Sequence, residues 1–252
     1  MQSVDGNKID LSLIMPAYNE QEGITAVLSE TKADLENTGL KWEIIVIDNC
    51  SNDQTVQRVT ELASADSRIK LLRHDHNKLY SGSCRTGIAA SGGEYVAIMD
   101  SDGQFVARDL PKMIQLLKNG SNLVFGWRRH RNDSIFRKFM SWFFNMMGRF
   151  WLGFPLHDLN SGIRIFDRKV VRILKIEHAI NMVNPEIFAQ VHAASLKVAE
   201  VEVEHFERRG GKTSHDLMKI GKILIQVNRY MATLRQVHLS GAKVKGAATE
   251  TI

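Results

Sequence analysis

The chain has 252 residues, of which 44% are hydrophobic and 24% are charged, as expected of a globular protein with one large α/β domain or two small ones. Its formal net charge of +5 is too small to indicate nucleic-acid binding, although it is compatible with an anionic substrate or a membrane surface. The sequence shows no apolar run of about 18 residues, no signal peptide and no metal-binding or redox spacing of its cysteines, so we expect a reduced, cytoplasmic protein without a membrane-spanning helix.

The first half of the chain alternates apolar runs, which predict buried strands, with apolar residues at helical spacing. Strands are expected at 11–16, 42–48, 68–72, 95–99 and 122–125. The helices expected between them lie at 22–37, 55–64, 80–90 and 109–118. This alternation predicts right-handed βαβ units and an α/β fold with a mainly parallel sheet flanked by helices.

The pattern changes after Gly126. Residues 135–151 predict a long helix that is both apolar and basic, and residues 186–194 predict a shorter helix. Residues 198–205 alternate between apolar and polar side chains, which indicates a half-exposed strand. An amphipathic helix is expected at 216–239.

Two carboxylates, Asp100 and Asp102, directly follow the strand expected at 95–99, and Gln104 lies two residues further on. Open α/β sheets bind ligands where their strands end. Carboxylate and amide oxygens suit a hard cation such as Mg²⁺ or Mn²⁺, which could bridge a pyrophosphate. An Asp-x-Asp pair alone also occurs in many surface turns, so its meaning depends on its neighbours.

The helix expected at 135–151 combines arginines with many aromatic residues. Between Gly126 and Phe150 there are six Arg or Lys residues against one acid, Asp133. The aromatic residues lie on nearly every face of the helix, which is more than one core contact needs. An exposed apolar face beside arginines suits lipid headgroups. A core helix with a solvated basic side is the alternative.

Taken together, these motifs resemble the inverting family-2 glycosyltransferases of the GT-A fold, and most closely the polyprenyl-phosphate sugar transferases of the dolichol-phosphate mannose synthase group. The resemblance runs from about residue 11 to residue 239 and rests on the order and spacing of its pieces. These are residues 13–20, 46–53, 83–90, 97–102 with Gln104, Arg137-x-x-x-Ser141-x-x-x-Asn145, 158–164 and His205-x-x-Arg208-x-x-Gly211-Lys212-Thr213. Gly103 and Thr213 depart from the family pattern and leave the identity of the sugar open.

The resemblance implies a role for each matching residue. It assigns binding of the nucleotide sugar to Pro16, Tyr18, Glu20, Asp48, Arg85, Ser101, Arg208 and Lys212. It assigns the metal to Asp100, Asp102 and Gln104, and the acceptor phosphate to Arg128, Arg137 and Ser141. Simpler interpretations remain open for several of them, because Glu20 could sit near a helix N-terminus, Asp48 could cap a turn and Arg85 could be a surface arginine.

The acceptor determines what catalysis requires. A sugar hydroxyl needs a general base, for which Asp158 is the best candidate, unless Asp158 instead orders the turn at 160–162. A phosphate monoester is already an anion near pH 7 and needs positioning rather than deprotonation. With the metal ligands and the phosphate-binding arginine named above, the candidate catalytic residues are Asp100, Asp102, Arg137 and Asp158.

The sequence thus predicts an inverting, metal-dependent hexosyltransferase that uses Mg²⁺ or Mn²⁺ and acts peripherally at the cytoplasmic face of a membrane. The expected donor is a nucleotide sugar of the GDP-mannose or UDP-glucose type, and the expected acceptor is a polyprenyl phosphate. The alternatives are the same fold acting on a glycan or soluble hydroxyl, and a non-catalytic membrane-binding subunit. A membrane subunit or a second copy of the chain is an open partner, and no nucleic acid is expected. The expected divisions are a flexible segment at 1–10, a catalytic domain at 11–214, an amphipathic helix for membrane docking at 215–239 and a disordered tail at 240–252.

Overall fold

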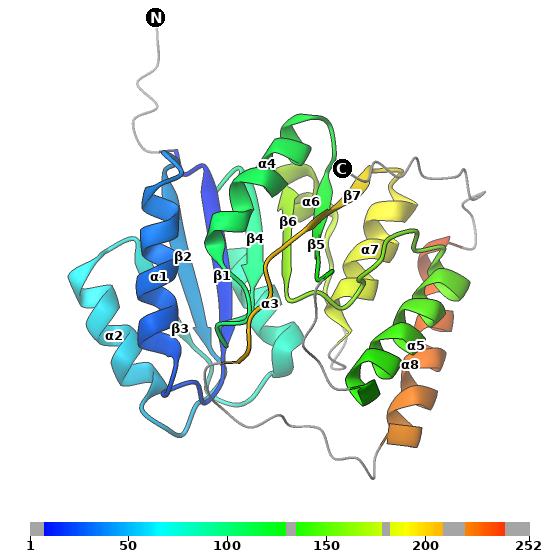
Figure 1. Cartoon of the computed structure of the whole chain (residues 1–252), viewed down its shortest axis with the longest axis horizontal. Helices are drawn as coiled ribbons and strands as arrows, with labels where there is room; N and C mark the ends of the chain where they lie inside the picture. The colour runs from blue at the N-terminus through cyan, green and yellow to red at the C-terminus, as the bar shows by residue number, and fades with distance from the viewer. Residues whose placement is uncertain (1–7, 130–134, 178–181, 209–219, 240–252) are drawn as a thin grey trace, which may run out of the picture.

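The computed structural model describes residues 8–129, 135–177, 182–208 and 220–239, and within them a seven-stranded sheet organises the chain (Figure 1). The strand order is β3-β2-β1-β4-β6-β5-β7. The strands are β1 (Leu11–Ala17), β2 (Trp42–Asp48), β3 (Ile69–Arg73), β4 (Tyr95–Met99), β5 (Leu123–Trp127), β6 (Ile163–Asp167) and β7 (Val198–Glu202).

Four of the strand pairings are parallel, and β6 alone runs antiparallel, between β4 and β5. The prediction of a mainly parallel sheet flanked by helices is confirmed. The sequence analysis missed β6, because its five residues include Arg164 and show no clear apolar run. The half-exposed strand predicted near the end of the chain is β7, which pairs with β5.

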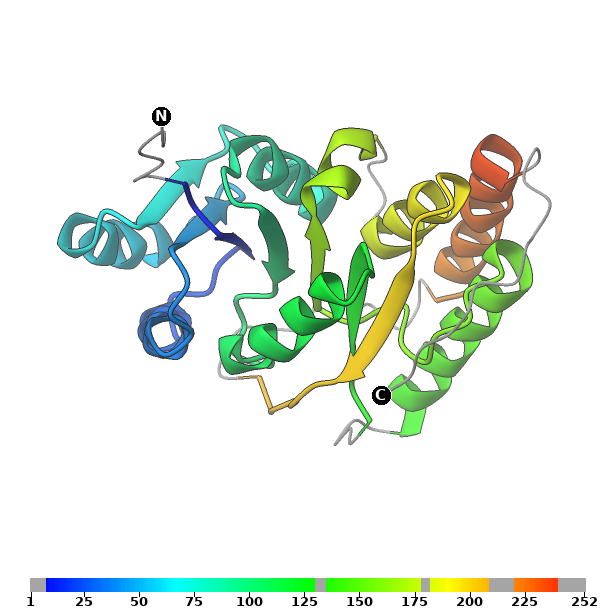
Figure 2. The ribbon, with the colours of Figure 1, turned by 90° about the horizontal axis from the view of Figure 1, so that it is seen from above.

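Helices cover both faces of the sheet, as Figure 2 shows from above. The helices are α1 (Ile24–Glu36), α2 (Thr55–Ala65), α3 (Leu79–Ala90), the 3-10 turn η1 (Ala107–Asp109), α4 (Leu110–Lys118), α5 (Ile135–Leu152), α6 (Arg168–Ile173), α7 (Val183–Ala193), α8 (Ile220–Leu234) and the π-helical turn η3 (Arg235–Leu239). One core cluster joins the sheet to α1, α2 and α4, and a second joins it to α3 and α5 to α8. Successive residues of a strand serve opposite faces, so Leu13 and Met15 of β1 belong to the first cluster and Ile14 to the second.

Most helix predictions are confirmed with shifts of one to three residues at their ends. The sequence analysis missed α6, which is capped at its N-terminus by Asp167, whose side chain accepts hydrogen bonds from the backbone N–H groups of Lys169 and Val170. Of the expected divisions, 1–7, 209–219 and 240–252 lie outside the described residues. The side chains of Val227 and Met231 on α8 belong to the same core cluster as α5 and α7, and the predicted boundaries stay predictions.

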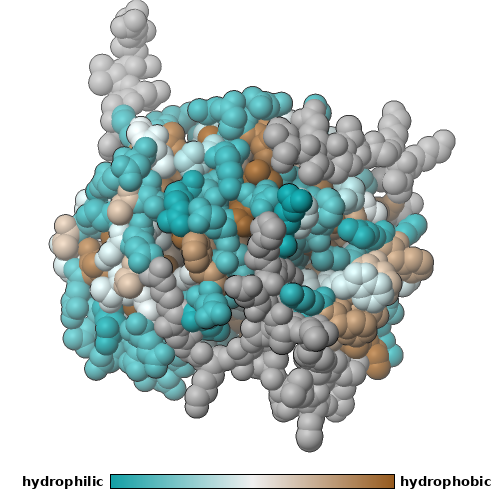
Figure 3. All heavy atoms as spheres, viewed as in Figure 1, coloured by the Kyte–Doolittle hydropathy of each residue, from teal (hydrophilic) through white to brown (hydrophobic). Residues whose placement is uncertain are grey.

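The aromatic residues of α5 divide between the core and the surface. Phe144 and Trp151 pack against the core, whereas Phe139, Trp142 and Phe150 are exposed. Figure 3 shows hydrophobic residues gathered at the lower right of the molecule, where Figure 1 places α5 and α8. Within the described ranges, none of the helices combines the length and the apolar character that a bilayer span requires. One side of α5 therefore belongs to the core and another is an exposed apolar face, and docking of that face on a membrane stays a prediction.

Candidate active site at the carboxyl ends of the strands

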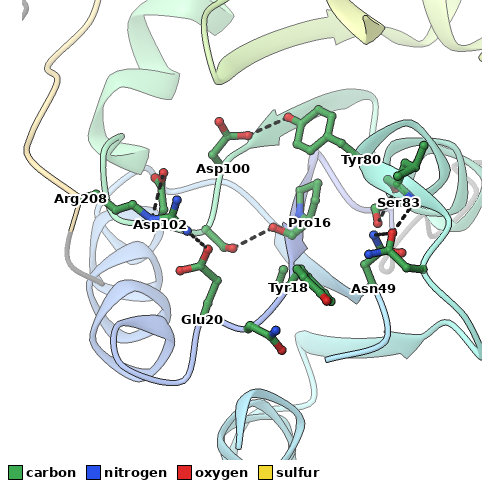
Figure 4. A pocket seen from close by; sticks show the side chains of 14 residues that line it. Pro16, Tyr18, Glu20, Asn49, Tyr80, Ser83, Asp100, Asp102 and Arg208 are labelled. Atoms are coloured by element: carbon green, nitrogen blue, oxygen red, sulfur yellow. Dashed lines mark hydrogen bonds and ion pairs between the residues drawn. The ribbon is translucent and has the colours of Figure 1, made fainter. Parts of the chain in front are cut away.

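A cavity of about 630 Å³ opens where β1, β2 and β4 end (Figure 4). This is the edge of the sheet at which an α/β fold is expected to bind ligands. The cavity is lined by Pro16, Ala17, Tyr18, Asn19, Glu20, Asn49, Asn77, Leu79, Tyr80, Ser83, Asp100, Ser101, Asp102 and Arg208. Seven of the predicted site residues are therefore brought together here: Pro16, Tyr18, Glu20, Asp100, Ser101, Asp102 and Arg208.

The loop after β1 forms one wall of the cavity. The buried Ser101 hydroxyl donates a 2.7 Å hydrogen bond to the Pro16 carbonyl and so joins the ends of β1 and β4. Tyr18 is 46% exposed in this otherwise polar wall, so its ring is available to a planar ligand. Asn19 has a φ of 54°, a left-handed conformation that asparagine tolerates, and its N–H donates to the Ser51 hydroxyl at 3.0 Å.

Asp48, at the end of β2, is buried and does not line the cavity. Its two carboxylate oxygens each accept the Ser51 N–H at 3.3 Å, so the side chain orders the following turn. The next residue, Asn49, lines the cavity and donates to the Asn77 side-chain oxygen at 2.9 Å. The turn-capping alternative is thus seen for Asp48, and its contact with a nucleotide stays a prediction.

Asp100 is held from two directions. The Tyr80 hydroxyl donates to its Oδ1 at 2.7 Å, and Arg164 Nη2 donates to the Tyr80 hydroxyl at 3.1 Å. On the other side, the Asp100 N–H donates to the Gly162 carbonyl at 3.1 Å. Burial and the negative charge of Asp102 raise the pKa of Asp100 to about 6, and the positive charge of Arg164 opposes the rise.

Arg208 lies between two acids at the mouth of the cavity. It forms an ion pair with Glu20, and its Nε lies 3.9 Å from Asp102 Oδ2 (Figure 4). Burial raises the pKa of Glu20 to about 7, Arg208 opposes the rise, and Asp102 and Asp100 add to it. Glu20 and Asp102 therefore share one arginine, and Asp100 adds a third carboxyl group nearby. A further cation would relieve the repulsion among the three groups.

The cavity supplies some, but not all, of the oxygen ligands that a hard divalent cation needs. Asp100 and Asp102 offer carboxylate oxygens from the loop after β4, and their mutual repulsion is the kind that a bound cation neutralises. Over the described ranges, no three His, Cys, Asp or Glu residues are grouped to hold a metal, so the remaining ligands would come from a diphosphate, water or Gln104. Gln104 is not among the residues that line the cavity, and its Nε2 donates to the Phe206 carbonyl at 3.3 Å, which secures the segment that carries Arg208. Its role as a metal ligand stays a prediction.

A second group lies at the end of β5. Arg128 Nε and Nη2 donate to the two oxygens of Asp158 at 2.7 and 2.9 Å, and Nη2 also donates to the Asn160 carbonyl at 2.9 Å. Asp158 is buried, so this bidentate pair orders the turn and fixes the guanidinium together. Arg128 is also among the charges that lower the pKa of Asp100, which places it near the cavity.

The other predicted residues are placed differently. Arg85 is exposed on α3, donates to the Ile176 carbonyl at 3.3 Å and does not line the cavity. Ser141 is half-buried on α5. Arg137 lies in the first turn of α5, but its side chain and the whole of Lys212 fall outside the described residues. Their roles stay predictions.

The sequence analysis missed several residues at the cavity. Asn49, Asn77, Leu79 and Tyr80 line it, and Arg164 stands behind Tyr80. The signal for Arg164 was an arginine within the apolar segment 163–166, which indicates a buried partner. Leu79 has a φ of 60°, a conformation that nothing in its sequence neighbourhood indicates.

Comparison with known proteins identifies the family of the chain. Residues 12–174 match the family model described as glycosyl transferase family 2. The chain is 29% identical to undecaprenyl-phosphate 4-deoxy-4-formamido-L-arabinose transferase of Pectobacterium atrosepticum, over 93% of this chain and 72% of the relative. It is 25% identical to dodecaprenyl-phosphate galacturonate synthase of Rhizobium johnstonii, over 90% of this chain and 68% of the relative.

Among solved structures, the fold is similar to that of glucosyl-3-phosphoglycerate synthase from Mycobacterium tuberculosis in complex with Mn²⁺, UDP-glucose and phosphoglyceric acid. The TM-score is 0.63 at 20% identity, over 92% of this chain and 82% of that one. This likeness supports the GT-A fold predicted from the sequence. Since the family model matches more than half of the chain, the protein belongs to glycosyl transferase family 2.

Proposed function

We propose that this glycosyltransferase moves a hexose from a nucleotide sugar to a polyprenyl phosphate, with inversion at the anomeric carbon. The observation that carries the proposal is the bidentate pairing of Arg128 with Asp158. It engages both oxygens of the carboxylate that could have served as a general base, and it fixes a guanidinium near the donor cavity. That arrangement suits an acceptor that is already an anion.

On the donor side, the cavity would hold the nucleotide against Tyr18, Pro16 and the ends of β1 and β4. Glu20 and Arg208 would take part once the diphosphate arrives, because the guanidinium that now pairs with Glu20 can also bind phosphate oxygens. A Mg²⁺ or Mn²⁺ ion held by Asp100 and Asp102 would supply charge neutralisation for the departing diphosphate. The Mn²⁺ and UDP-glucose in the structurally similar synthase support this class of donor site.

On the acceptor side, Arg128 would bind the lipid phosphate, and Arg137 and Ser141 are proposed to join it from the first turns of α5. The phosphate oxygen would attack the anomeric carbon without a base. The two relatives described above, both of which are named for a polyprenyl phosphate, support this acceptor. The exposed Phe139 and Trp142 on the same helix would rest at the membrane surface, which makes the protein peripheral.

A hydroxyl acceptor is the second candidate, and one observation favours it. His157 pairs through Nδ1 with the buried Glu200, stacks on Trp127 with ring centroids 4.4 Å apart and is 47% exposed. A carboxylate-held imidazole can act as a general base. A soluble glycan acceptor would then use His157 in the role that Asp158 cannot fill.

The test is a transfer assay with a panel of UDP- and GDP-sugars, undecaprenyl phosphate in detergent, and Mg²⁺ or Mn²⁺. Mass spectrometry of the lipid fraction should show one hexose added to the lipid phosphate, with the nucleoside diphosphate released. Transfer to soluble glycans in place of the lipid, with every donor, would favour the second candidate. Absence of any transfer with the whole panel would contradict the proposal.

A further inference from the structure

Arg164 is an arginine buried beside the carboxyl end of β4. It is 1% exposed on β6, where it lies opposite Ile98 of β4 in the antiparallel register. Its Nη2 donates to the Tyr80 hydroxyl at 3.1 Å and lies 3.5 Å from Cys84 Sγ. Burying a charged group costs desolvation free energy, so a buried arginine beside the cavity indicates that its charge has a role there.

The hydrogen bonds run in one direction from Arg164 to Asp100. The Tyr80 hydroxyl has a single proton, which it donates to Asp100 Oδ1 at 2.7 Å, so it can only accept from Arg164. Figure 4 shows the Tyr80 hydroxyl directed at Asp100 along the cavity wall. Arg164 is thus linked to the Asp100 carboxylate by two hydrogen bonds through the neutral Tyr80 side chain, rather than by a direct ion pair.

Gly162 packs closely against the other carboxylate oxygen of Asp100. A Cβ atom at Gly162 would lie 2.2 Å from Asp100 Oδ2 and 2.5 Å from the Phe105 ring, so only glycine leaves room for the carboxylate. Oδ1 is fixed by a hydrogen bond and Oδ2 by close packing. The carboxylate of Asp100 is therefore held in one orientation. Gly162 directly precedes the antiparallel strand β6, and Arg164 lies on it.

We propose that Tyr80 and Arg164 are positioning residues that act in series to fix the Asp100 carboxylate for the cation and diphosphate. This rests on the proposed role of Asp100 in the donor site. Tyr80 holds the carboxylate, and Arg164 holds the Tyr80 hydroxyl in the orientation that donates. Neither residue is part of the predicted set of donor, metal or acceptor ligands.

The test is titration of Mn²⁺ alone into the protein, followed by the loss of the free-ion electron paramagnetic resonance signal, together with steady-state kinetics. Tyr80→Phe removes one oxygen and leaves the ring. We expect Mn²⁺ affinity and kcat each to fall about tenfold, as for loss of a hydrogen bond to a charged group, with acceptor KM and Tm near the original values. Tyr95→Phe, at the other end of β4, is the matched control and should change neither.

A series arrangement also predicts how the two residues combine. Arg164→Met should weaken Mn²⁺ binding, and the double variant should be no weaker than the more affected single variant, because removing either residue breaks the same chain. Additive effects would show that the residues act independently and would overturn the inference. If Arg164→Met fails to fold, Tyr80→Phe alone decides the outcome.

Asp102→Asn separates this inference from the proposed metal site. If Asp102→Asn loses Mn²⁺ and Tyr80→Phe binds it with unchanged affinity and kcat, the positioning role is wrong and the metal site stands. If Asp102→Asn also retains Mn²⁺ affinity, the proposed metal site itself is wrong.

Discussion

The two carboxylates of the cavity differ in how firmly neighbouring residues hold them. Asp100 is held by Tyr80 and Gly162, whereas Asp102 is half-buried and faces Arg208 at 3.9 Å. The sequence located both carboxylates, because a strand that ends in Asp-x-Asp is a local pattern. It could not locate Tyr80 and Arg164, because their partners are 20 and 84 residues away along the chain.

Asp102→Asn should lower metal-dependent transfer by about a hundredfold or more, because a neutral amide is a poor ligand for a hard cation that stabilises the leaving group. The circular dichroism spectrum should not change. The measurement is kcat as a function of Mn²⁺ concentration. Transfer at the original rate with unchanged metal dependence would refute the assignment of Asp102.

Gly162→Ala should damage the site more than the fold. The added methyl would lie 2.2 Å from Asp100 Oδ2, so the carboxylate must move, while overpacking of this kind costs stability by about 1–3 kcal/mol. We expect kcat to fall at least tenfold with a modest decrease in Tm. Gly120→Ala is a control with no neighbour near its Cβ position, although its φ of 102° also costs stability. A loss of Tm without loss of kcat would contradict this account of Asp100.

Arg128→Lys should raise the acceptor KM about tenfold or more and leave the donor KM unchanged, because a lysine cannot bind phosphate and Asp158 in the forked geometry. Steady-state kinetics with each substrate varied in turn provide the measurement. Arg129→Lys, at the neighbouring exposed position paired with Glu202, is the control. A change confined to the donor KM would show that Arg128 does not serve the acceptor.

At the scale of whole elements, the periodicity of the sequence predicted most strands and helices, since β1, β2 and β4 consist mostly of apolar residues. It failed at β6, where a buried arginine interrupts the apolar pattern and the pairing depends on β4 and β5, which are distant in sequence. It left α5 undecided between core and membrane, because a helix with apolar residues on every side gives no preferred face. The structure shows which side of α5 packs against α7, α8 and the core, and the membrane role of the other side stays a prediction.

The exposed side of α5 should bind anionic vesicles. Phe139 and Trp142 are more than half exposed and share the helix with basic residues, so apolar insertion and attraction to lipid phosphates would act together. In co-sedimentation with phosphatidylglycerol vesicles, the double variant Phe139→Ser/Trp142→Ser should lose most of the binding, and added salt should weaken binding of the original protein. Val237→Ser, which removes an apolar side chain that is 66% exposed in η3, is the control. Equal effects of the two changes, or no binding at low salt, would contradict docking through α5.

Across the whole molecule, one half of the sheet carries the proposed donor site and the other half carries the proposed acceptor site. The parallel strands β3, β2, β1 and β4 build the donor cavity, and β5 with the turn before β6 holds Arg128 and Asp158. The strand order reverses between the parallel strands β1 and β4, which is the type of position where α/β sheets bind ligands. The fold class and several residues of the cavity were predicted from local sequence patterns, whereas the pairing of Arg128 with Asp158 joins segments that are distant in the sequence.

The central claim is that the nucleophile is a lipid phosphate. Its most direct test compares undecaprenyl phosphate with undecaprenol, the same lipid without phosphate, as acceptors for the donor sugar that supports transfer. We predict transfer to undecaprenyl phosphate alone, with an acceptor KM that rises in Arg128→Lys. Efficient transfer to undecaprenol or to a soluble hydroxyl, with none to undecaprenyl phosphate, would contradict the account.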